Sequence, residues 1–498
     1  MLPAIEYIDF KKQDDIVPLY KEWVKSTHSF LSYLNTQRGT ICLCWDPDVD
    51  GIFSGYIALK FIKKHFPNIA VLNYMHETKV HGVNDLLIYY CLENDVDLLL
   101  CVDCGSSDYE QLSRLTNKGI KVIVCDHHLI EGYKDYKNDI NLTLINANLL
   151  KGYEELSGAT MTLYLMTQVT GDKALFHELI ELAIVTIVSD ICPTETINKR
   201  IMLNYVYSHY KSNAVLEKVQ GHFNITRNFL ISFSSKLNAV IRYCGPRYLM
   251  ELVSAGLENL QDINFKHIKQ KDTERIELLQ ERMHIYDFNN IIIAVFSDEI
   301  SEYYKRHNVR NYIGIIANKL SSKYNKLAIV MMPSRADYEM YNFQTLFTYS
   351  ARDCQSRSAI NLFTKEKGFK ANGHLSAFGG TITREFNFEE MVRLDKELSE
   401  MKPNETNKVI PLEDITPFIR DNNSYVIKVG IMNNVHREQY CFEGYLNGYI
   451  KSKGYHKEIV TEGIKMKSYD LSINLYSKVR VIPIFSGKEI EYIVERCK

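Results

Sequence analysis

Acidic and imidazole side chains gather at the ends of apolar segments in this 498-residue chain. The set comprises Asp48, Asp50, Asp103, Asp126, His127 and His128. Carboxylates that converge on one place repel one another and raise each other's pKa, and a bound cation relieves that cost. Carboxylate ligands mixed with imidazole suit Mn²⁺ and also allow Mg²⁺. The residue types therefore predict a site for two ions of Mn²⁺ or Mg²⁺, a known device for in-line attack on phosphodiesters.

The segments that carry these side chains predict one sheet. Apolar runs at 40–45, 69–75, 97–103 and 121–126 alternate with stretches of helical spacing, which indicates a parallel sheet with helices on both faces. Ligands bind such sheets at the carboxyl ends of the strands. The competing interpretation makes each aspartate a helix N-cap and DPDVDG a plain turn. All of the aspartates together, with a double histidine at a strand end, favour the metal site.

Charge is distributed unevenly along the chain, although its net value is only −2. Residues 41–130 hold 12 acidic and 7 basic residues, whereas residues 301–384 hold 13 basic and 5 acidic ones. An acidic block and a basic block suit a metal site that faces a polyanion-binding surface. Two solvated faces of unlike sign would give the same counts.

The pattern predicts an α/β protein with more than one domain. A parallel-sheet domain over 1–256 would be followed by a long, exposed connecting helix at 257–288, rich in Lys, Glu and Gln. The strand and helix pattern restarts near 290, which predicts a smaller α/β domain over 289–402. Beyond the polar segment 402–408, short alternating strands predict a β-rich, OB-like domain over 409–498.

Composition excludes several classes of protein. Apolar residues make up 46% and charged residues 24%, as in ordinary globular chains. No apolar run approaches the ~20 residues that cross a bilayer, and the first residues do not resemble a signal peptide, so no membrane is expected as a partner. The eleven cysteines are scattered and odd in number, which favours a reducing cytoplasm. The only CxxC, at 101–104, lies in an apolar strand, which favours buried structural cysteines over a zinc site.

Four sequence motifs, in their order along the chain, resemble those of a known protein family. WDPDVDG, LLLCVDCG, VIVCDHH and IVTIVSD resemble the four motifs of the DHH phosphoesterase superfamily. LSGAT (156–160), SARDCQSRS (350–358), NGHLSAFGG (372–380) and TPFIRDNN (416–423) are similar to segments of its RecJ branch. The resemblance covers about residues 40–425. Where RecJ proteins carry a Pro-x-Arg element, this chain has HETK at 76–79, which leaves Lys79 as the candidate point charge.

The resemblance implies a role for each matching residue. The catalytic residues would be Asp103, Asp126, His127 and His128, with Asp126 orienting its neighbour and His128 contacting the scissile phosphate or completing a metal shell. The metal ligands would be Asp46, Asp48, Asp50, Asp103, His127 and Asp190, with Asp103 bridging the two ions. Substrate phosphates would be bound by Ser350, Arg352, Gly373 and His374, with Arg357 as the runner-up to Arg352.

The family further implies a function. We expect a RecJ-like, metal-dependent exonuclease that degrades single-stranded DNA with 5′→3′ polarity by two-metal activation of water. A single-strand-binding protein and a helicase are its expected protein partners. Two alternatives stay open: a DHH phosphodiesterase for short RNA oligonucleotides or cyclic dinucleotides, and a non-catalytic scaffold that binds single-stranded DNA.

Overall fold

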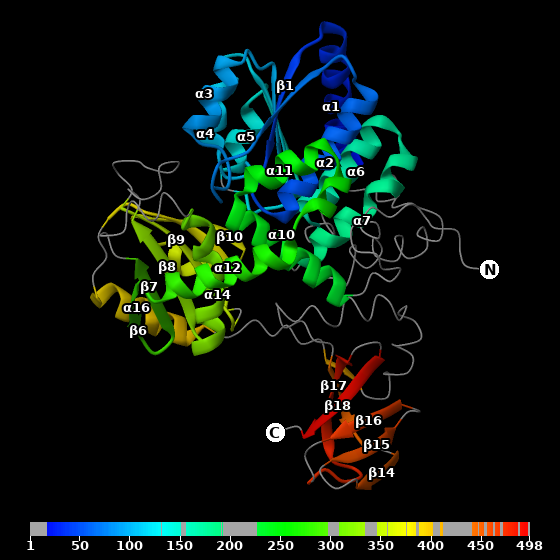
Figure 1. Ribbon diagram of the computed structural model, residues 1–498, viewed down its shortest axis with the longest axis vertical. Coiled ribbons are helices and arrows are strands. Elements are labelled where there is room, and N and C mark those ends of the chain that lie inside the picture. Colours follow the sequence, from blue (N-terminus) through cyan, green and yellow to red (C-terminus); the bar gives the residue numbers. More distant parts are fainter. Residues whose placement is uncertain are drawn as a thin grey trace, which may run out of the picture.

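The computed structural model of the protein contains three separate sheets that follow one another along the chain (Figure 1). The structure describes residues 17–130, 132–150, 156–190, 192, 227–296, 308–333, 346–355, 357–374, 376–384, 388–401, 409–411, 441–446, 448–452, 456–461, 464–468, 472–486 and 489–496. Among the helices within these ranges, none combines the length and apolar character that a bilayer crossing requires.

The first sheet is parallel, with the strand order β2-β1-β3-β4-β5. Its elements in chain order are α1 (Val17–Gln37), β1 (Thr40–Trp45), α2 (Val49–His65), β2 (Ala70–Tyr74), α3 (Asp85–Glu93), β3 (Leu98–Val102), α4 (Tyr109–Thr116), β4 (Lys121–Asp126), α5 (Tyr133–Asn138), β5 (Leu142–Asn146), the 3-10 turn η2 (Ala147–Leu149), α6 (Gly158–Thr170) and α7 (Lys173–Ser189). The parallel α/β class predicted from the sequence is confirmed.

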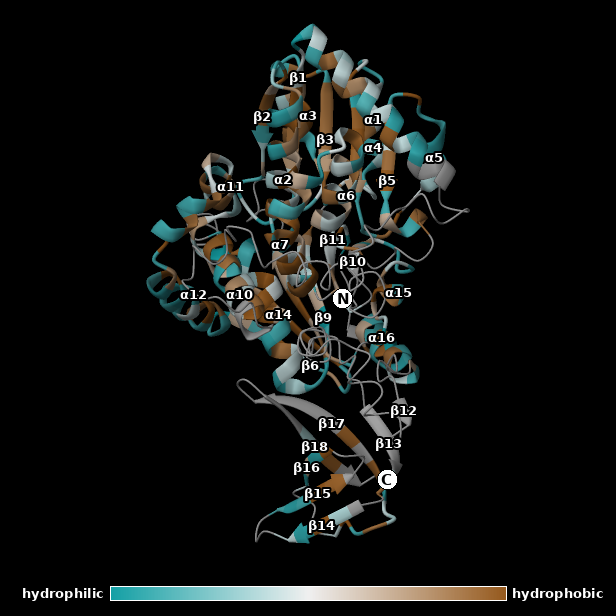
Figure 2. Ribbon diagram, turned by 90° about the vertical axis from the view of Figure 1, so that its right-hand side faces the viewer, coloured by the Kyte–Doolittle hydropathy of each residue, from teal (hydrophilic) through white to brown (hydrophobic). Residues whose placement is uncertain are grey.

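Burial on both faces explains why the central strands β1, β3 and β4 are almost entirely apolar. Leu43 and Trp45 of β1 pack in a core with residues of α1, α2, α6 and α7, while Cys42 and Cys44 point to the other face, toward α3, α4 and α5. All four side chains are at most 1% exposed. Figure 2 shows β3 in the brown of hydrophobic residues, while the edge strand β2 is hydrophilic at its end. Since neighbouring parallel strands end at one edge, the residues that follow β1, β3 and β4 are brought together there.

A helical segment connects the first sheet to the second. It consists of α10 (Arg227–Cys244), α11 (Pro246–Ala255), the 3-10 helix η4 (Leu257–Asp262) and α12 (Phe265–Gln280). The single long helix predicted over 257–288 is wrong, because only its middle is α-helical. The Asn264 side chain caps α12 by accepting a hydrogen bond from the His267 N–H at 3.1 Å, and residues 283–287 form a strand instead.

The second sheet is mixed, with the order β10-β11-β9-β8-β7-β6. Its elements are β6 (Met283–Asp287), β7 (Ile291–Phe296), α14 (Arg310–Tyr324), β8 (Leu327–Pro333), β9 (Phe347–Asp353), α15 (Ile360–Phe363), β10 (Phe369–His374), β11 (Ala377–Ile382) and α16 (Phe388–Glu400). Apolar side chains of α14 and α12 cover one face, and those of α15 and α16 cover the other. At the N-terminal end of α14, the Asn311 side chain accepts a hydrogen bond from the Lys79 N–H at 2.6 Å and so connects this sheet to the first domain.

The third sheet has seven strands in the order β12-β13-β17-β18-β16-β15-β14. They are β12 (Val409–Pro411), β13 (Cys441–Tyr445), β14 (Gly448–Ser452), β15 (Lys457–Thr461), β16 (Ile464–Ser468), β17 (Lys478–Ser486) and β18 (Glu489–Arg496). The predicted β-rich C-terminal region is therefore confirmed. Its OB-like character and the domain boundaries at 256, 288, 402 and 409 stay predictions.

Candidate metal centre

The loop after β1 folds back on itself to begin α2. Asp48 is the N-cap of this helix, and its Oδ1 accepts hydrogen bonds from the N–H groups of Asp50 (3.0 Å) and Gly51 (3.2 Å). A Cβ on residue 51 would lie 2.3 Å from the carbonyl oxygen of Asp46, so only glycine fits there. The turn interpretation of DPDVDG thus holds for Asp48, and the tight turn leaves Asp46 and Asp50 buried beside it.

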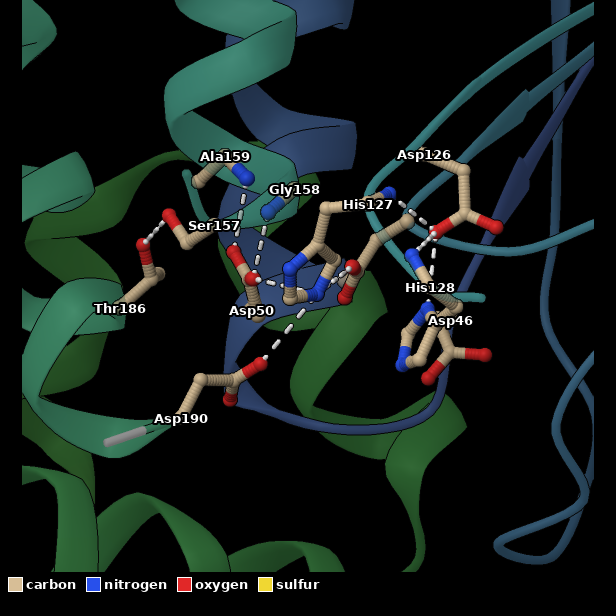
Figure 3. A network of polar contacts seen from close by, with 12 residues as sticks. Asp46, Asp50, Asp126, His127, His128, Ser157, Gly158, Ala159, Thr186 and Asp190 are labelled. Atoms are coloured by element: carbon tan, nitrogen blue, oxygen red, sulfur yellow. Dashed lines mark hydrogen bonds and ion pairs between the residues drawn. The ribbon is translucent and has the colours of Figure 1, made fainter. Parts of the chain in front are cut away.

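The His127 imidazole lies at the centre of three carboxylates (Figure 3). Its Nε2 is 3.2 Å from Oδ1 of Asp103, 3.5 Å from Oδ2 of Asp190 and 3.7 Å from Oδ2 of Asp50. Asp50 follows β1, Asp103 follows β3, His127 follows β4 and Asp190 is the C-cap residue of α7. Ligand atoms of Asp50, His127 and Asp190 lie within 4.8 Å of one another, as do those of Asp103, His127 and His128.

The N-terminus of α6 positions the carboxylate of Asp50. The N–H groups of Gly158 and Ala159 donate hydrogen bonds of 2.7 Å to its two oxygens (Figure 3). Ser157 caps the same helix and contacts the Thr186 hydroxyl at 2.7 Å. A Cβ on residue 158 would lie 2.2 Å from Oδ1 of Asp103, so the glycine lets the helix approach both carboxylates. This contact gives the LSGAT segment a physical role.

Asp103 occupies a strained backbone position. Its φ is 63°, in the left-handed region that residues other than glycine rarely adopt, and its N–H is held by the Cys125 carbonyl at 2.9 Å. Such conformations cost about 1–3 kcal/mol and are found mainly at functional sites. The strained backbone turns the Asp103 side chain toward His127.

Asp126 organises the double histidine. Its oxygens accept hydrogen bonds from the N–H groups of Ser106 (3.0 Å), His127 (2.7 Å) and His128 (3.2 Å), and Oδ1 is 2.8 Å from Nδ1 of His128. Although burial opposes both charges, this pairing raises the pKa of His128 to about 10 and lowers the pKa of Asp126. Asp126 therefore holds the loop and keeps the His128 imidazole charged.

Three other carboxylates of the cluster have raised pKa values. Burial, and then the charge of Asp48, raises the pKa of Asp50 to about 7. Burial and the charge of Asp50 also raise the pKa of Asp103 and of Asp190. Burial, and then the charge of His128, lowers the pKa of His127 to about 4, so the imidazole is neutral at pH 7 and can donate a lone pair.

A divalent cation fits this donor set. Oδ1 of Asp46 and Oδ1 of Asp103 are buried and accept no hydrogen bond from the residues that the structure describes. An unsatisfied buried oxygen costs about 1–3 kcal/mol, and the crowded carboxylates add repulsion. A bound cation would remove both costs, so the residues predicted to be metal ligands fit Mn²⁺ or Mg²⁺.

Three polar residues near the site escape the sequence prediction. Asn146 at the end of β5 donates through Nδ2 to the His128 carbonyl at 2.9 Å, and Asn148 donates to the His127 carbonyl at 2.7 Å. The position of Asn146 after a strand was a usable signal, because it repeats that of the aspartates. Nδ1 of His81 lies 2.6 Å from Oδ2 of Asp46. His81 belongs to a loop without periodicity, so no pattern indicated it.

The second sheet brings the predicted phosphate-binding residues together. β11 lies between β9 and β10 and pairs Gly379 with Ser350 and Phe378 with Gly373. Gly373 has a φ of 128°, a conformation open to glycine. His374 ends β10, and its side chain lies outside the described part of the structure.

The two candidate arginines have different surroundings. Arg352 donates to the Ser350 hydroxyl at 3.0 Å, and no carboxylate among the described residues pairs with it, so burial lowers the pKa of its guanidinium to about 10. Arg357 is 3% exposed and donates two hydrogen bonds, of 3.0 and 3.1 Å, to the carboxylate of Asp353. Arg357 is thus already neutralised, whereas Arg352 is available for an anion.

Lys79 interacts electrostatically with residues of both the metal centre and the arginine cluster. Burial lowers the pKa of Lys79, and the charges of Arg242 and Arg352 add to this shift while Asp48 opposes it. The Arg310 guanidinium donates to the Lys79 carbonyl at 3.3 Å. Lys79 therefore interacts electrostatically with Asp48 of the acidic cluster and with Arg352 of the second sheet.

Parts of the chain are similar to known proteins. Residues 40–187 match the family described as the DHH family, N-terminal domain. A Bacillus subtilis protein, provisionally named as an SPbeta prophage-derived single-strand DNA-specific exonuclease, is 24% identical over 274 residues, which are 52% of this chain and 45% of that protein. The single-stranded-DNA-specific exonuclease RecJ of Haemophilus influenzae is 26% identical over 177 residues, 32% of this chain and 30% of its own.

The fold of the chain is also similar to that of a solved structure. The alignment with the crystal structure of RecJ in complex with Mn²⁺ from Thermus thermophilus covers 97% of this chain and 72% of the RecJ chain. The TM-score is 0.62 and the sequence identity is 16%. At that identity the likeness shows a shared fold. The chain spans less than half the length of the curated relatives that it matches.

Proposed function

We propose, from the match of residues 40–187 to the DHH family, that the protein is a metal-dependent exonuclease that hydrolyses phosphodiester bonds of single-stranded DNA from the 5′ end. The observation that carries the proposal is the buried group of Asp50, Asp103, His127 and Asp190, where like charges meet and a carboxylate oxygen lacks a hydrogen bond within the described residues. The names of the relatives support single-stranded DNA as substrate.

Each residue type then has a defined task. Two divalent ions, preferably Mn²⁺, would supply positive charge to the phosphate oxygens and make water a stronger acid when bound. Neutral His127 presents a lone pair to them. His128, whose side chain is 30% exposed and charged through Asp126, donates a hydrogen bond to the scissile phosphate. Arg352 and Ser350 bind a further phosphate, and the backbone at Gly373 lets it approach closely.

The wider setting is proposed on the same basis. The first sheet with its helices would carry out catalysis, and the second and third sheets would bind the strand. The C-terminal sheet would lengthen the path for a long strand. Nine cysteines of the described part of the chain are free thiols, which supports a reducing cytoplasm, where a single-strand-binding protein and a helicase would supply substrate.

The alternatives differ from this proposal in substrate or in turnover. A phosphodiesterase for short RNA or cyclic dinucleotides needs only the first two sheets, and the seven-stranded third sheet favours a longer substrate. A non-catalytic scaffold would not need the acidic cluster, with its cost in repulsion and strain.

The deciding experiment uses single-stranded DNA labelled at either end, incubated with Mn²⁺, with EDTA, or with the Asp103→Ala variant. We expect mononucleotides from the 5′ end only, and none with EDTA or the variant. Release from the 3′ end would contradict the polarity. Cleavage of RNA dinucleotides in preference to DNA would move the protein to the short-substrate branch, and binding without cleavage would support the scaffold.

A further inference from the structure

We propose that His81 is a ligand of one of the two metal ions and completes a second ligand set with Asp46 and Asp48. This inference rests on the proposed metal-dependent function and deepens it. The family resemblance assigns no role to His81, and the inference depends on the geometry around Asp46. Ligand atoms of the three side chains lie within 4.8 Å of one another.

The surroundings of Asp46 indicate that something besides His81 binds there. Asp46 is 1% exposed, and its Oδ2 lies 2.6 Å from Nδ1 of His81. Its other oxygen, Oδ1, is buried and accepts no hydrogen bond from the described residues. An ion pair with His81 alone would leave that oxygen unsatisfied, which costs free energy. A cation between Asp46, Asp48 and His81 would satisfy it.

The spacing suits a cation after a small adjustment. Ligand atoms at neighbouring corners of an octahedron with bonds of ~2.1 Å stand ~3 Å apart. Nδ1 of His81 and Oδ2 of Asp46 are a few tenths of an ångström closer than that, as expected for a pair that attracts directly when no ion separates it. The His81 side chain is 51% exposed, so it can move outward without disturbing the core.

Hydrogen bonds on the C-terminal side of His81 fix the backbone. The Gly82 carbonyl lies 3.0 Å from Nε2 of His76, and the Val83 N–H donates to the Asp108 carboxylate at 2.9 Å. Gly82 has a φ of 82°, which turns the chain sharply after His81. The loop therefore presents the imidazole at a defined place although its tip is exposed.

The proposed metal centre then contains two ligand sets, each with one imidazole. The inner set is Asp50, His127 and Asp190, and the outer set is Asp46, Asp48 and His81, with Asp103 next to His127. Nitrogen ligands favour Mn²⁺ over Mg²⁺, which prefers oxygen alone. His81 should therefore raise the preference of the outer position for Mn²⁺.

The test compares His81→Gln with His65→Gln in the full chain. His65 is a matched control, because its Nε2 lies 2.8 Å from Oδ2 of Asp172 in another histidine–aspartate pair. Mn²⁺ is titrated into each protein, and free Mn²⁺ is measured by electron paramagnetic resonance. We expect two ions bound to the wild type and to His65→Gln. In His81→Gln we expect one ion unchanged and the other weakened by at least ~10-fold.

A second readout separates a ligand from a residue that only orients Asp46. Pulsed electron paramagnetic resonance detects nitrogen bound to Mn²⁺, and His81→Gln should lose one histidine nitrogen signal that His65→Gln retains. Unchanged affinity in His81→Gln would overturn the inference. Weaker binding with an unchanged nitrogen signal in the loaded variant would also overturn it, because His81 would then be a positioning residue.

These outcomes are independent of the substrate. If His81→Gln loses the ion and the nitrogen signal while the wild type cleaves no DNA, the ligand inference stands and the proposed exonuclease function fails. If the wild type cleaves DNA from the 5′ end and His81→Gln keeps both ions, the function stands and the inference fails.

Discussion

Two arginines five residues apart should respond in opposite ways to the same substitution. Arg357→Met removes one partner of a buried ion pair and leaves Asp353 as an uncompensated charge, since Arg357 is 3% and Asp353 4% exposed. Arg352→Met removes a cation that has no carboxylate partner among the described residues. Methionine approximates the length of the arginine stem and keeps most of its packing.

The expected magnitudes follow from these surroundings. Breaking a buried pair by removing one partner costs about 3–5 kcal/mol, so Arg357→Met should lower the free energy of unfolding by that amount. Burial lowers the pKa of Arg352 from 12.5 to about 10, which means that the folded state disfavours its charge at pH 7. Because Arg352 is partly exposed, solvent screens part of this effect, and removing the charge should raise the free energy of unfolding by about 1–3 kcal/mol. The loss of the hydrogen bonds to the Ser350 hydroxyl and the Ala351 carbonyl destabilises the variant by about 1–2 kcal/mol and offsets part of this gain.

Urea unfolding and fluorescence anisotropy with labelled single-stranded DNA measure the two effects separately. We expect Arg357→Met to lose stability and, where it is folded, to bind DNA like the wild type. Arg352→Met should stay within about 1 kcal/mol of wild-type stability or exceed it, and should bind DNA at least ~10-fold more weakly. A loss of stability in Arg352→Met equal to that in Arg357→Met would refute the distinction, as would unchanged DNA binding by Arg352→Met.

Further outcomes follow from the metal centre and the thiols. Asp103→Ala should abolish turnover in saturating Mn²⁺ and raise the stability of the metal-free protein, as activity assays and urea unfolding would show. Because the pKa of Asp50 is raised to about 7, Mn²⁺ must displace a proton below that pH. Affinity should therefore rise with pH up to about 7, and calorimetry in buffers of different ionisation enthalpy should detect proton release. Asn148→Ala removes the donor to the His127 carbonyl and should weaken Mn²⁺ binding ~10-fold by calorimetry. Cys244 and Cys354 are the half-buried thiols among the described cysteines, and they should react with a thiol reagent before the buried ones.

The sequence was most informative where a periodic element ends at the site. Because β1, β3 and β4 are neighbours in a parallel sheet, residues at their carboxyl ends lie at one edge, and this reasoning predicted a cluster of Asp48, Asp50, Asp103 and Asp126. The family motifs added Asp190, which comes from the end of α7 and which strand order alone could not have placed.

Prediction was weaker where the partner of a side chain decides its role. The family resemblance offered Arg357 as the runner-up to Arg352 for phosphate binding, but only the structure shows that Asp353 neutralises it. His81 lies on a loop whose course depends on buried contacts of His76 and Asp108, which no local pattern encodes. The composition of 257–288 favoured one helix, while the pairing of residues 283–287 with β7 decided their structure.

The unfavourable features of the first domain coincide at one sheet edge, and this coincidence indicates what they are for. Asp103 has a strained backbone, its Oδ1 lacks a hydrogen bond within the described residues, and its pKa is raised by burial and by Asp50. Each feature alone would be selected against for stability. All three are relieved by one event, the binding of divalent cations, whereas a structural role for the aspartates would require only the N-cap that Asp48 provides. The sheet, apolar on both faces, supplies the stability that such a site costs before an ion arrives.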